Sequence, residues 1–360
     1  MKRLVVCCDG TWQQPDQSRD GVGCPTNVVK LASLVVSEDT KGAKQRLFYH
    51  DGIGATSGGL RRWWQGLTGA GINQVLRETY SWIVRNYEPG DQLYLFGYSR
   101  GAYTARSVAG LIRNSGVLKP VNEDKLVEAL ALYRSRDRKT EPRAAASRLF
   151  RRSYCWADVT PIELVGVWDT VGALGVPNTV LQGALKALSR QNIEFHDTNL
   201  GPHIRMACHA VCIDERRKPF LPTLWTVPAD GFAPGQRLAQ LWFPGYHGDI
   251  GGGEPDSSLG DLSLGWMVEM AERAGLSVAP PDHLASLGLP QWQPRPDGPL
   301  HDTSSWFYGL LGDGTRTIPS PTADRADLEG LHNSVEQRRA VRPDWQPRAL
   351  EDYLARDGHG

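Results

Sequence analysis

The sequence has no excess charge of either sign, no paired-cysteine motif and no long hydrophobic run. It contains 40 Lys and Arg against 40 Asp and Glu in 360 residues. A neutral chain lacks the broad basic surface that binds phosphate backbones, so we expect no nucleic-acid partner. The six cysteines include no C-x-x-C pair, which argues against a zinc ribbon and suits a reducing compartment. No apolar stretch approaches the roughly 18 residues of a membrane-spanning helix.

Motifs that hold metals or phosphates are also missing. The sequence contains no Walker loop, no EF-hand loop and no H-E-x-x-H pair, so we expect neither a metal nor a cofactor. The N-terminal Met1-Lys2-Arg3 is followed by five apolar residues and then Asp9, which is shorter than a secretory signal. We therefore expect the chain to be cytoplasmic in the producing cell, with export by a signal-independent secretion system as the alternative.

Short apolar runs alternate along the chain with helical patterns, which is typical of a parallel sheet with crossover helices. The expected strands are Leu4–Cys8, Arg46–His50, Gln92–Phe96, Ile162–Trp168 and Leu238–Phe243, whereas Arg205–Cys212 fits a strand or a helix. The expected helices are Ile72–Asn86, Ala102–Asn114 and approximately Ser263–Ala274. The sequence thus predicts an α/β fold with a mostly parallel central sheet and helices on both faces.

Two regions depart from this alternation. Residues 119–154 are charged and helix-prone, which predicts an inserted cap or a surface insertion. After Leu276 the chain carries ten of its 24 prolines, so residues 277–360 are expected to form an irregular tail wrapped around the core. We predict one catalytic domain over residues 1–360.

A nucleophile-elbow motif follows the third expected strand. Gly97-Tyr98-Ser99-Arg100-Gly101 fits G-x-S-x-G and leads directly into a helix, which is the strand–turn–helix context of α/β-hydrolases. The glycines are needed because a Cβ on either side of the strained turn would collide with its neighbours. Such a turn exposes the Ser99 hydroxyl and directs the Arg100 backbone N–H at a developing oxyanion. The alternative is a tight turn whose serine caps the helix.

A serine nucleophile requires an acid and a histidine base, which follow it in the chain order Ser, acid, His. Asp169 ends the apolar strand Ile162–Trp168, which places a carboxylate at the carboxyl edge of the sheet, where open sheets bind ligands. Asp169 could instead be a helix N-cap. Asp214 and Asp249 are the competing acids.

Nine histidines compete for the role of base. His247 lies in a glycine-dense loop directly after the apolar run Leu238–Phe243, and such a backbone can curl to bring the imidazole over the elbow. We therefore favour His247, with His209 and His332 as alternatives.

The first expected strand leads into Cys7-Cys-Asp-Gly-Thr11, which is similar to the D-x-D-G-T motif of haloacid-dehalogenase-type phosphatases. The nucleophilic aspartate of that motif is Cys7 here, so aspartyl-phosphate chemistry has no first step. We interpret Asp9-Gly10-Thr11 as a tight loop in which the N–H of Thr11 or Trp12 is the second oxyanion donor.

Several motifs occur together in a known order between residues 4 and about 340. They are Asp9–Thr11, Tyr49–Gly54, Tyr87–Arg106, Val167–Val171, Ile213–Arg217, Trp242–Gly253 and His332–Val335. This set resembles a bacterial and fungal α/β-hydrolase family that includes the catalytic domains of type VI secretion phospholipase effectors. The resemblance implies a hydrolase with the triad Ser99, Asp169 and His247, a phospholipid substrate, and a secretion or immunity partner. The family's loop usually reads His-Ser-Asp, and Gly248 replaces that serine before Asp249.

These observations predict a serine ester hydrolase of the phospholipase A or lipase type. The stretch Leu60–Leu67 contains Arg61, Arg62, Trp63 and Trp64, a combination that suits peripheral contact with a membrane, although the tryptophans could instead pack inward. A hydrolase of small soluble esters or thioesters is one alternative. A non-catalytic binding module that retains the fold is another.

Overall fold

The computed structural model describes residues 1–10, 18–19, 21–52, 69–172, 199–228, 230–302, 314–320 and 329–357. Within this part of the chain, seven parallel strands form one sheet in the order β4-β1-β5-β6-β7-β8-β9. Their bounds are Arg3–Cys8 (β1), Gln45–His50 (β4), Gln92–Tyr98 (β5), Ile162–Trp168 (β6), Ile204–Cys212 (β7), Arg237–Phe243 (β8) and Glu329–Leu331 (β9). A small antiparallel ribbon, Ser18–Arg19 (β2) with Val22–Gly23 (β3), lies outside the sheet.

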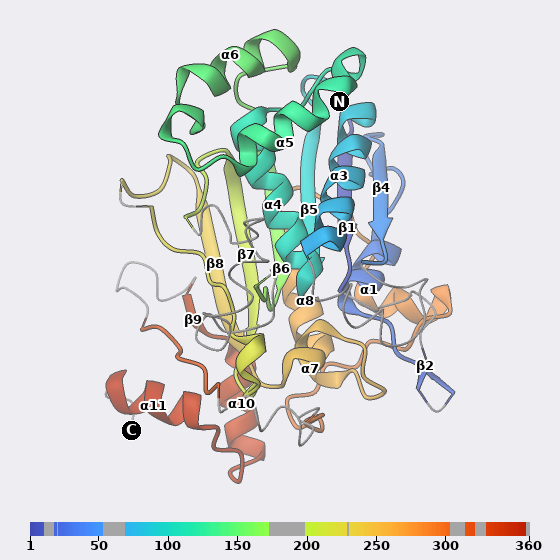
Figure 1. Ribbon diagram of the computed structural model, residues 1–360. Helices are drawn as coiled ribbons and strands as arrows, with labels where there is room; N and C mark the ends of the chain where they lie inside the picture. The colour runs from blue at the N-terminus through green and yellow to red at the C-terminus, as the bar shows by residue number, and fades with distance from the viewer. Residues whose placement is uncertain are drawn as a thin grey trace.

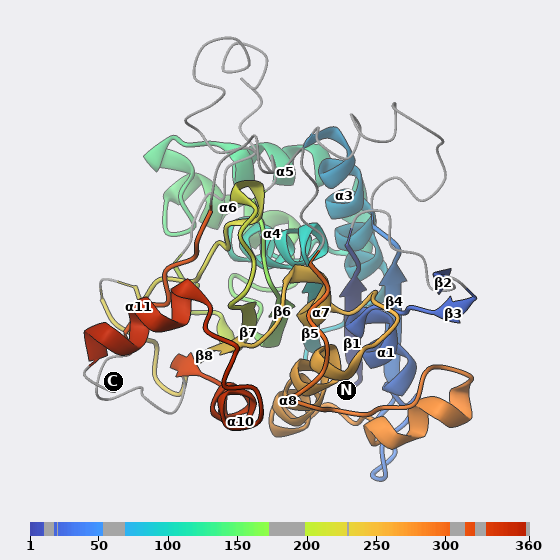
Figure 2. The same cartoon turned by 90° about the horizontal axis from the view of Figure 1, so that it is seen from below.

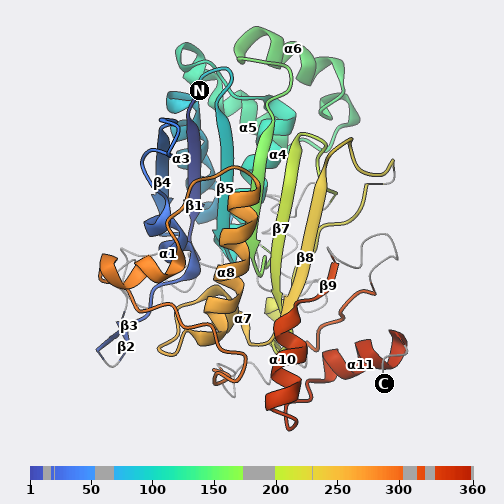
Figure 3. The same cartoon turned by 180° about the vertical axis from the view of Figure 1, so that it is seen from behind.

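Helices cover both faces of this sheet (Figures 1 and 2). One face carries Gly69–Asn86 (α3) and Arg100–Ser115 (α4), with Leu126–Arg134 (α5) and Ala145–Tyr154 (α6) packed on α4. The other face carries Asn27–Leu34 (α1) and Ser258–Arg273 (α8), as Figure 3 shows. The other α-helices in the described part of the chain are His247–Gly251 (α7), Asn333–Val341 (α10) and Arg348–Asp357 (α11). The predicted α/β-hydrolase-like fold is therefore confirmed.

Two hydrophobic cores follow from this arrangement, because successive side chains of a strand point to opposite faces. In β1, Leu4 and Val6 join the core under α3 and α4, whereas Val5 and Cys7 join the core under α1 and α8. Cys7 and Cys8 are fully buried, so they pack as small hydrophobic residues.

The charged segment at residues 119–154 lies at the amino-terminal ends of the strands. It leaves the end of α4, includes α5 and α6, and returns toward the start of β6 at Ile162. In Figure 1 these helices are at the opposite end of the sheet from α7. This segment therefore covers the edge of the sheet that is remote from Ser99.

After residue 276 the chain first packs on α1, which Pro281–Leu287 (η4) contacts, and its last part packs against β8. Its strand β9 pairs with β8, and α10 and α11 bury a third cluster that includes Val335, Trp345 and Leu350 against Trp242. The irregular tail thus includes a strand and two helices that the sequence reading did not predict. The ambiguous segment Arg205–Cys212 is strand β7.

Candidate functional site

Three of the predicted site residues lie at the carboxyl ends of parallel strands. Ser99 directly follows β5, Asp169 directly follows β6, and His247 begins α7 four residues after β8. Parallel strands bring residues that are distant in sequence to one edge of the sheet, where ligands bind in folds of this type.

The backbone at Ser99 has a strained conformation. Its φ is 57° and its ψ is −119°, a region that a non-glycine residue adopts at a cost and that occurs at functional sites. The backbone N–H of Ser99 donates to the Trp168 carbonyl oxygen at 3.0 Å, which ties the turn to β6. An ideal Cβ on Gly97 would lie 2.4 Å from the carbonyl oxygen of Gly101. The elbow therefore requires glycine at this position.

We expect Gly101→Ala to disrupt the fold. An added Cβ would lie 2.1 Å from the Cys8 carbonyl oxygen and 2.4 Å from that of Asp9, and neither backbone atom can move without displacing β1. The loss of stability should exceed about 3 kcal/mol, as for other severe steric insertions. Thermal unfolding measures it, and Gly23→Ala is the matched control, since nothing lies within 4 Å of its added Cβ. A Gly101→Ala protein as stable as this control would contradict the close approach.

The side chains of the three residues form one chain of hydrogen bonds. His247 Nε2 lies 2.8 Å from Ser99 Oγ, and His247 Nδ1 lies 2.6 Å from Asp169 Oδ2. All three residues are buried, and Ser99 is 8% exposed. In this geometry the imidazole can accept the hydroxyl proton while the carboxylate holds its other nitrogen.

Asp169 is fully buried and remains ionised because a cation binds it. Both guanidinium Nη atoms of Arg316 contact the carboxylate, at 2.6 Å to Oδ1 and 2.8 Å to Oδ2. Burial alone would raise the pKa of Asp169, but the charge and hydrogen bonds of Arg316, together with His247, hold that pKa well below its usual range. The backbone N–H of Cys212 also donates to Oδ1 at 3.3 Å. The carboxylate is thus available as an anion at any working pH.

Sequence reasoning missed Arg316. It lies in the proline-rich tail, 147 residues beyond Asp169, and no motif in the sequence surrounds it. Only the folding of the tail against the ends of β7 and β8 brings its side chain to the acid.

Two aromatic rings pack against the His247 imidazole, and a hydrogen bond holds the His247 backbone. The Tyr98 ring lies over it with centroids 4.8 Å apart, and the Phe220 ring meets it edge-on at 5.0 Å. The Tyr98 hydroxyl donates to the His247 carbonyl oxygen at 3.1 Å. These contacts fix the ring over the elbow.

The motif Ile213–Arg217 supports the loop that carries His247. Asp214 Oδ2 accepts the Gly245 N–H at 2.7 Å, and Glu215 Oε2 lies 3.4 Å from the backbone nitrogen of His247. Burial favours the neutral form of Glu215, but hydrogen bonds and charge from Arg217 outweigh it and lower the pKa. Two carboxylates of this motif therefore anchor the loop.

The competing acids have other partners. Asp214 also accepts from Trp345 Nε1 at 2.8 Å, and burial raises its pKa to about 6. Asp249 accepts the Tyr246 N–H at 2.8 Å, which caps α7, and contacts His301 Nδ1 at 2.7 Å. The structure therefore places Asp249 in support of the histidine loop.

The competing histidines lie in structural positions. His209 is fully buried in β7, its Nε2 accepts the Thr170 N–H at 3.0 Å, and burial, with the nearby Arg106 charge, lowers its pKa to about 3. His332 caps α10 through Ser334 and stacks on Phe243, and burial lowers its pKa to about 4. Among the described contacts, neither ring is hydrogen-bonded to Ser99.

The loop after β1 lies directly beside the elbow. Asp9 is buried and accepts hydrogen bonds from Gly10 N, Thr26 Oγ1 and Tyr49 Oη at 2.6–2.8 Å. Burial raises its pKa to about 6 despite these bonds. Asp9 thus fixes the start of the predicted oxyanion loop, whereas Thr11 and the membrane-contact residues Arg61, Arg62, Trp63 and Trp64 lie outside the described residues.

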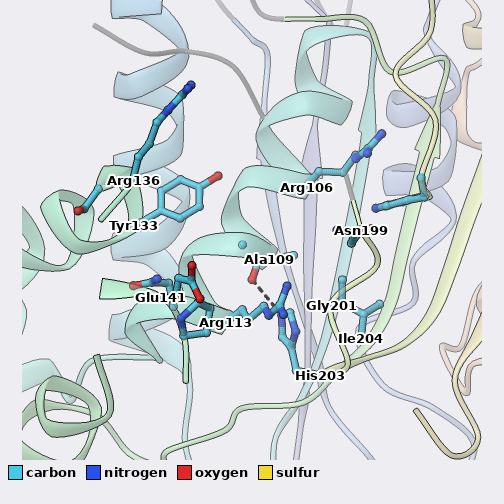
Figure 4. Close-up of a pocket in the computed structure, with 15 residues that line it drawn as sticks. Arg106, Ala109, Arg113, Tyr133, Arg136, Glu141, Asn199, Gly201, His203 and Ile204 are labelled. Carbon is cyan, nitrogen blue, oxygen red and sulfur yellow. Dashed lines mark hydrogen bonds between the residues drawn. The ribbon is translucent and has the colours of Figure 1, made fainter. Parts of the chain in front are cut away.

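A cavity of about 470 Å³ lies away from this edge (Figure 4). Its lining includes Arg106, Ala109 and Arg113 of α4, with Tyr133 and His203 facing them; His203 Nε2 contacts the Ala109 carbonyl oxygen at 2.9 Å. None of the three triad candidates lines it, so it is separate from the serine site.

Among the described residues, no group of three or more His, Cys, Asp or Glu could hold a metal. No helix in the same residues is long and apolar enough to cross a membrane.

Comparison with known proteins agrees with this architecture. A parallel sheet with a serine elbow at its carboxyl edge defines an α/β-hydrolase-like protein. Residues 2–270 match the family described as the catalytic domain of Tle1-like phospholipase effectors of the type VI secretion system (T6SS). Since this match covers well over half of the chain, the chain belongs to that family, which confirms the resemblance seen in its motifs.

Individual relatives are more distant and longer. The uncharacterized protein YEL023C of Saccharomyces cerevisiae is 25% identical over 245 residues, which are 62% of this chain and 33% of the yeast protein. A crystal structure of an uncharacterized protein from Pseudomonas aeruginosa has a TM-score of 0.43 and 16% identity, covering 78% of this chain and 47% of that one. The structure of the Tle1 effector bound to the VgrG spike has a TM-score of 0.40 and 18% identity, covering 70% and 51%. The chain spans about a third of the yeast relative and about half of each solved chain.

Proposed function

We propose that this chain is a serine hydrolase that cleaves carboxylic ester bonds of phospholipids, as a phospholipase A or lipase does, through Ser99, Asp169 and His247. The observation that carries the proposal is the hydrogen-bond chain from Ser99 Oγ through the His247 imidazole to Asp169. The elbow strain at Ser99 and membership of a phospholipase-effector family support it.

The geometry supports an acyl-enzyme mechanism. His247 Nε2 takes the Ser99 proton as Oγ attacks the ester carbonyl, and the imidazolium that forms is stabilised by Asp169. The backbone N–H of Arg100, at the start of α4, and that of Thr11 are proposed to bind the oxyanion. His247 then returns the proton to the leaving alcohol, which frees a lysophospholipid. A water molecule, deprotonated by the same nitrogen, hydrolyses the acyl-enzyme and releases the fatty acid.

Two measurements test this function. A fluorophosphonate probe should label the protein at Ser99, as located by peptide mapping, and mixed phospholipid vesicles should yield free fatty acid and lysophospholipid in equal amounts. Labelling with turnover of small soluble esters or thioesters, but not vesicles, would assign the alternative substrate class. A folded protein that neither reacts with the probe nor turns over any ester would be a binding module, which would overturn the proposal.

Family membership also supports a route of delivery. We propose that the chain is exported as, or as part of, a type VI secretion effector, with a secretion-apparatus protein and an immunity protein as partners. Loss of the chain from culture supernatant when the secretion system is inactivated would test the route.

Asp169→Asn should lower turnover by about 10³-fold or more with little change in KM. The amide has one acceptor oxygen, which the Arg316 fork will take, so its NH2 faces His247 Nδ1. His247 Nδ1 must then accept a hydrogen bond from this NH2 group, so the neutral imidazole carries its proton on Nε2. A protonated Nε2 cannot receive the Ser99 proton. Steady-state kinetics of the folded variant measure the effect. A loss under tenfold would return Asp214 and Asp249 as candidates for the acid.

A further inference from the structure

Arg316 binds both oxygens of the candidate acid, Asp169. Its side chain and that of Asp169 are both 0% exposed, and each carboxylate oxygen receives one Nη atom. The same guanidinium donates to the carbonyl oxygen of Cys212 at 2.9 Å and to that of Phe220. One side chain therefore links the ends of β6 and β7 and the loop that holds Phe220.

The planar fork fixes the orientation of the carboxylate as well as its charge. Asp169 Oδ2 is shared between Arg316 Nη2 and His247 Nδ1, so the plane that Arg316 imposes determines where Nδ1 can sit. Asp169 also has a left-handed backbone, with φ of 39°, which an aspartate adopts only when its surroundings hold it there. A lysine would supply the charge but not the two parallel bonds.

Stability does not account for such a pair. Desolvation of two buried charges offsets most of their attraction, and well-packed apolar residues often replace a buried ion pair without loss of stability. Two effects of Arg316 could not come from an apolar residue: the fork that orients the carboxylate, and the charge that acts on the histidine through it.

The surrounding charges are balanced when the imidazole is neutral. Among the described residues, two carboxylates and two guanidinium groups face this cluster: Asp169 after β6, Glu215 and Arg217 after β7, and Arg316 in the tail. The other titratable groups that face it are Cys212 and His209 of β7, Tyr98 of β5 and His247 of α7. Beyond them, one further carboxylate, Asp9, acts on Tyr98, and one further guanidinium, Arg106, acts on His209. Protonation of His247 gives this cluster one uncompensated positive charge.

We propose that Arg316 is the positioning residue of the catalytic acid: its fork holds the Asp169 carboxylate in the plane that meets His247 Nδ1, and its charge offsets part of the carboxylate's charge beside the imidazole. The inference rests on the proposed serine-hydrolase function. Without Arg316, the full negative charge of the Asp169 carboxylate would act on the imidazole and favour its protonated form. The onset of activity would then move to higher pH.

Two substitutions separate the charge of Arg316 from its geometry. In Arg316→Met the acid limb of the kcat/KM profile should move up by about one pH unit, with turnover at the plateau lowered about 100-fold. In Arg316→Lys the charge remains, so the limb should stay within about 0.3 pH units while turnover falls about tenfold. Should the Met variant fail to fold, Arg316→Gln removes the charge and keeps a donor to Asp169.

Arg338→Met is the matched control. Counted as whole residues, Arg338 is 1% and Arg316 is 2% exposed, and Arg338 donates to the carbonyl oxygens of Pro296 and Gly298 instead of contacting the triad. This control should lose stability without moving the limb. An unshifted limb in a folded, uncharged Arg316 variant, or an equal shift in the control, would overturn the inference.

An NMR titration of the His247 imidazole separates this inference from the proposed function. Its midpoint should rise in Arg316→Met whether or not the protein turns over an ester. Hydrolysis that survives Ser99→Ala would refute the serine mechanism, whereas an unchanged His247 midpoint would refute the role of Arg316.

Discussion

Replacing Ser99 with alanine is expected to leave less than about one part in a hundred of wild-type ester hydrolysis. The alanine retains the elbow and the oxyanion donors but has no oxygen to attack the carbonyl, and no other hydroxyl is hydrogen-bonded to the His247 imidazole among the described residues. Background catalysis by the remaining donors is far slower than turnover through an acyl-enzyme.

The fold of this variant should survive. Alanine at φ 57° is as strained as serine. Among the described contacts, the Ser99 hydroxyl is hydrogen-bonded to the His247 imidazole, and the fold does not depend on this bond. The melting temperature should therefore change little. Ser107→Ala, a buried serine two turns further along α4, is the matched control and should keep its activity. The serine mechanism would be refuted if Ser99→Ala kept more than a hundredth of wild-type turnover and the fluorophosphonate probe still labelled another residue of this variant.

The sequence predicted the sheet well because buried parallel strands are continuous apolar runs. Leu4–Cys8 and Ile162–Trp168 are apolar on both faces, and helices on both sides bury them in β1 and β6. The segment Arg205–Cys212 was ambiguous because its histidine and arginine interrupt that pattern. The structure resolves it as β7, where Thr170 and Gln240 satisfy the buried His209 ring.

The tail was harder to predict because its elements are stabilised by tertiary contacts. Strand β9 has three residues, and α10 and α11 bury Val335 and Leu350 against β8 instead of showing a long amphipathic repeat. Local propensity carries little information about such segments.

The candidate site divides in the same way. The serine was identifiable because the elbow is a local motif with a steric requirement for glycine at Gly97 and Gly101. Arg316 had no local signal, because a bidentate bond to Asp169 across 147 residues depends on how the tail folds. The three triad candidates thus lie in motifs that the sequence shows, whereas Arg316, which contacts Asp169, lies in none.

His247→Ala is expected to inactivate as fully as Ser99→Ala, and the double variant should be no worse than either single variant. Among the histidines that the structure describes, only His247 is hydrogen-bonded to the hydroxyl, with Nε2 2.8 Å from Oγ, so its loss leaves the serine protonated and unreactive. Residues that act as one unit show this non-additivity, whereas independent contributions would multiply.

His209→Ala and His332→Ala provide the comparison. His209→Ala leaves the Thr170 N–H without its acceptor and opens a cavity in β7, which should cost about 1–3 kcal/mol. His332→Ala removes the cap of α10 and should cost about 1 kcal/mol. Both variants should bind the probe at Ser99 and keep most of their turnover per folded molecule, because neither ring is hydrogen-bonded to the serine or the acid.

Probe labelling, turnover and thermal unfolding of the three single variants and the double variant test the assignment together. The distance from the serine hydroxyl determines which histidine can act as the base before its pKa does, because a base must lie within about 3 Å of the group whose proton it takes. His209 has its Nε2 occupied by the Thr170 N–H, and the His332 ring is bound to Ser334 at the start of α10. Substantial activity in His247→Ala, or complete loss confined to a folded His332→Ala, would mean that the loop after β8 moves away from the elbow during catalysis and that a histidine of the tail replaces His247.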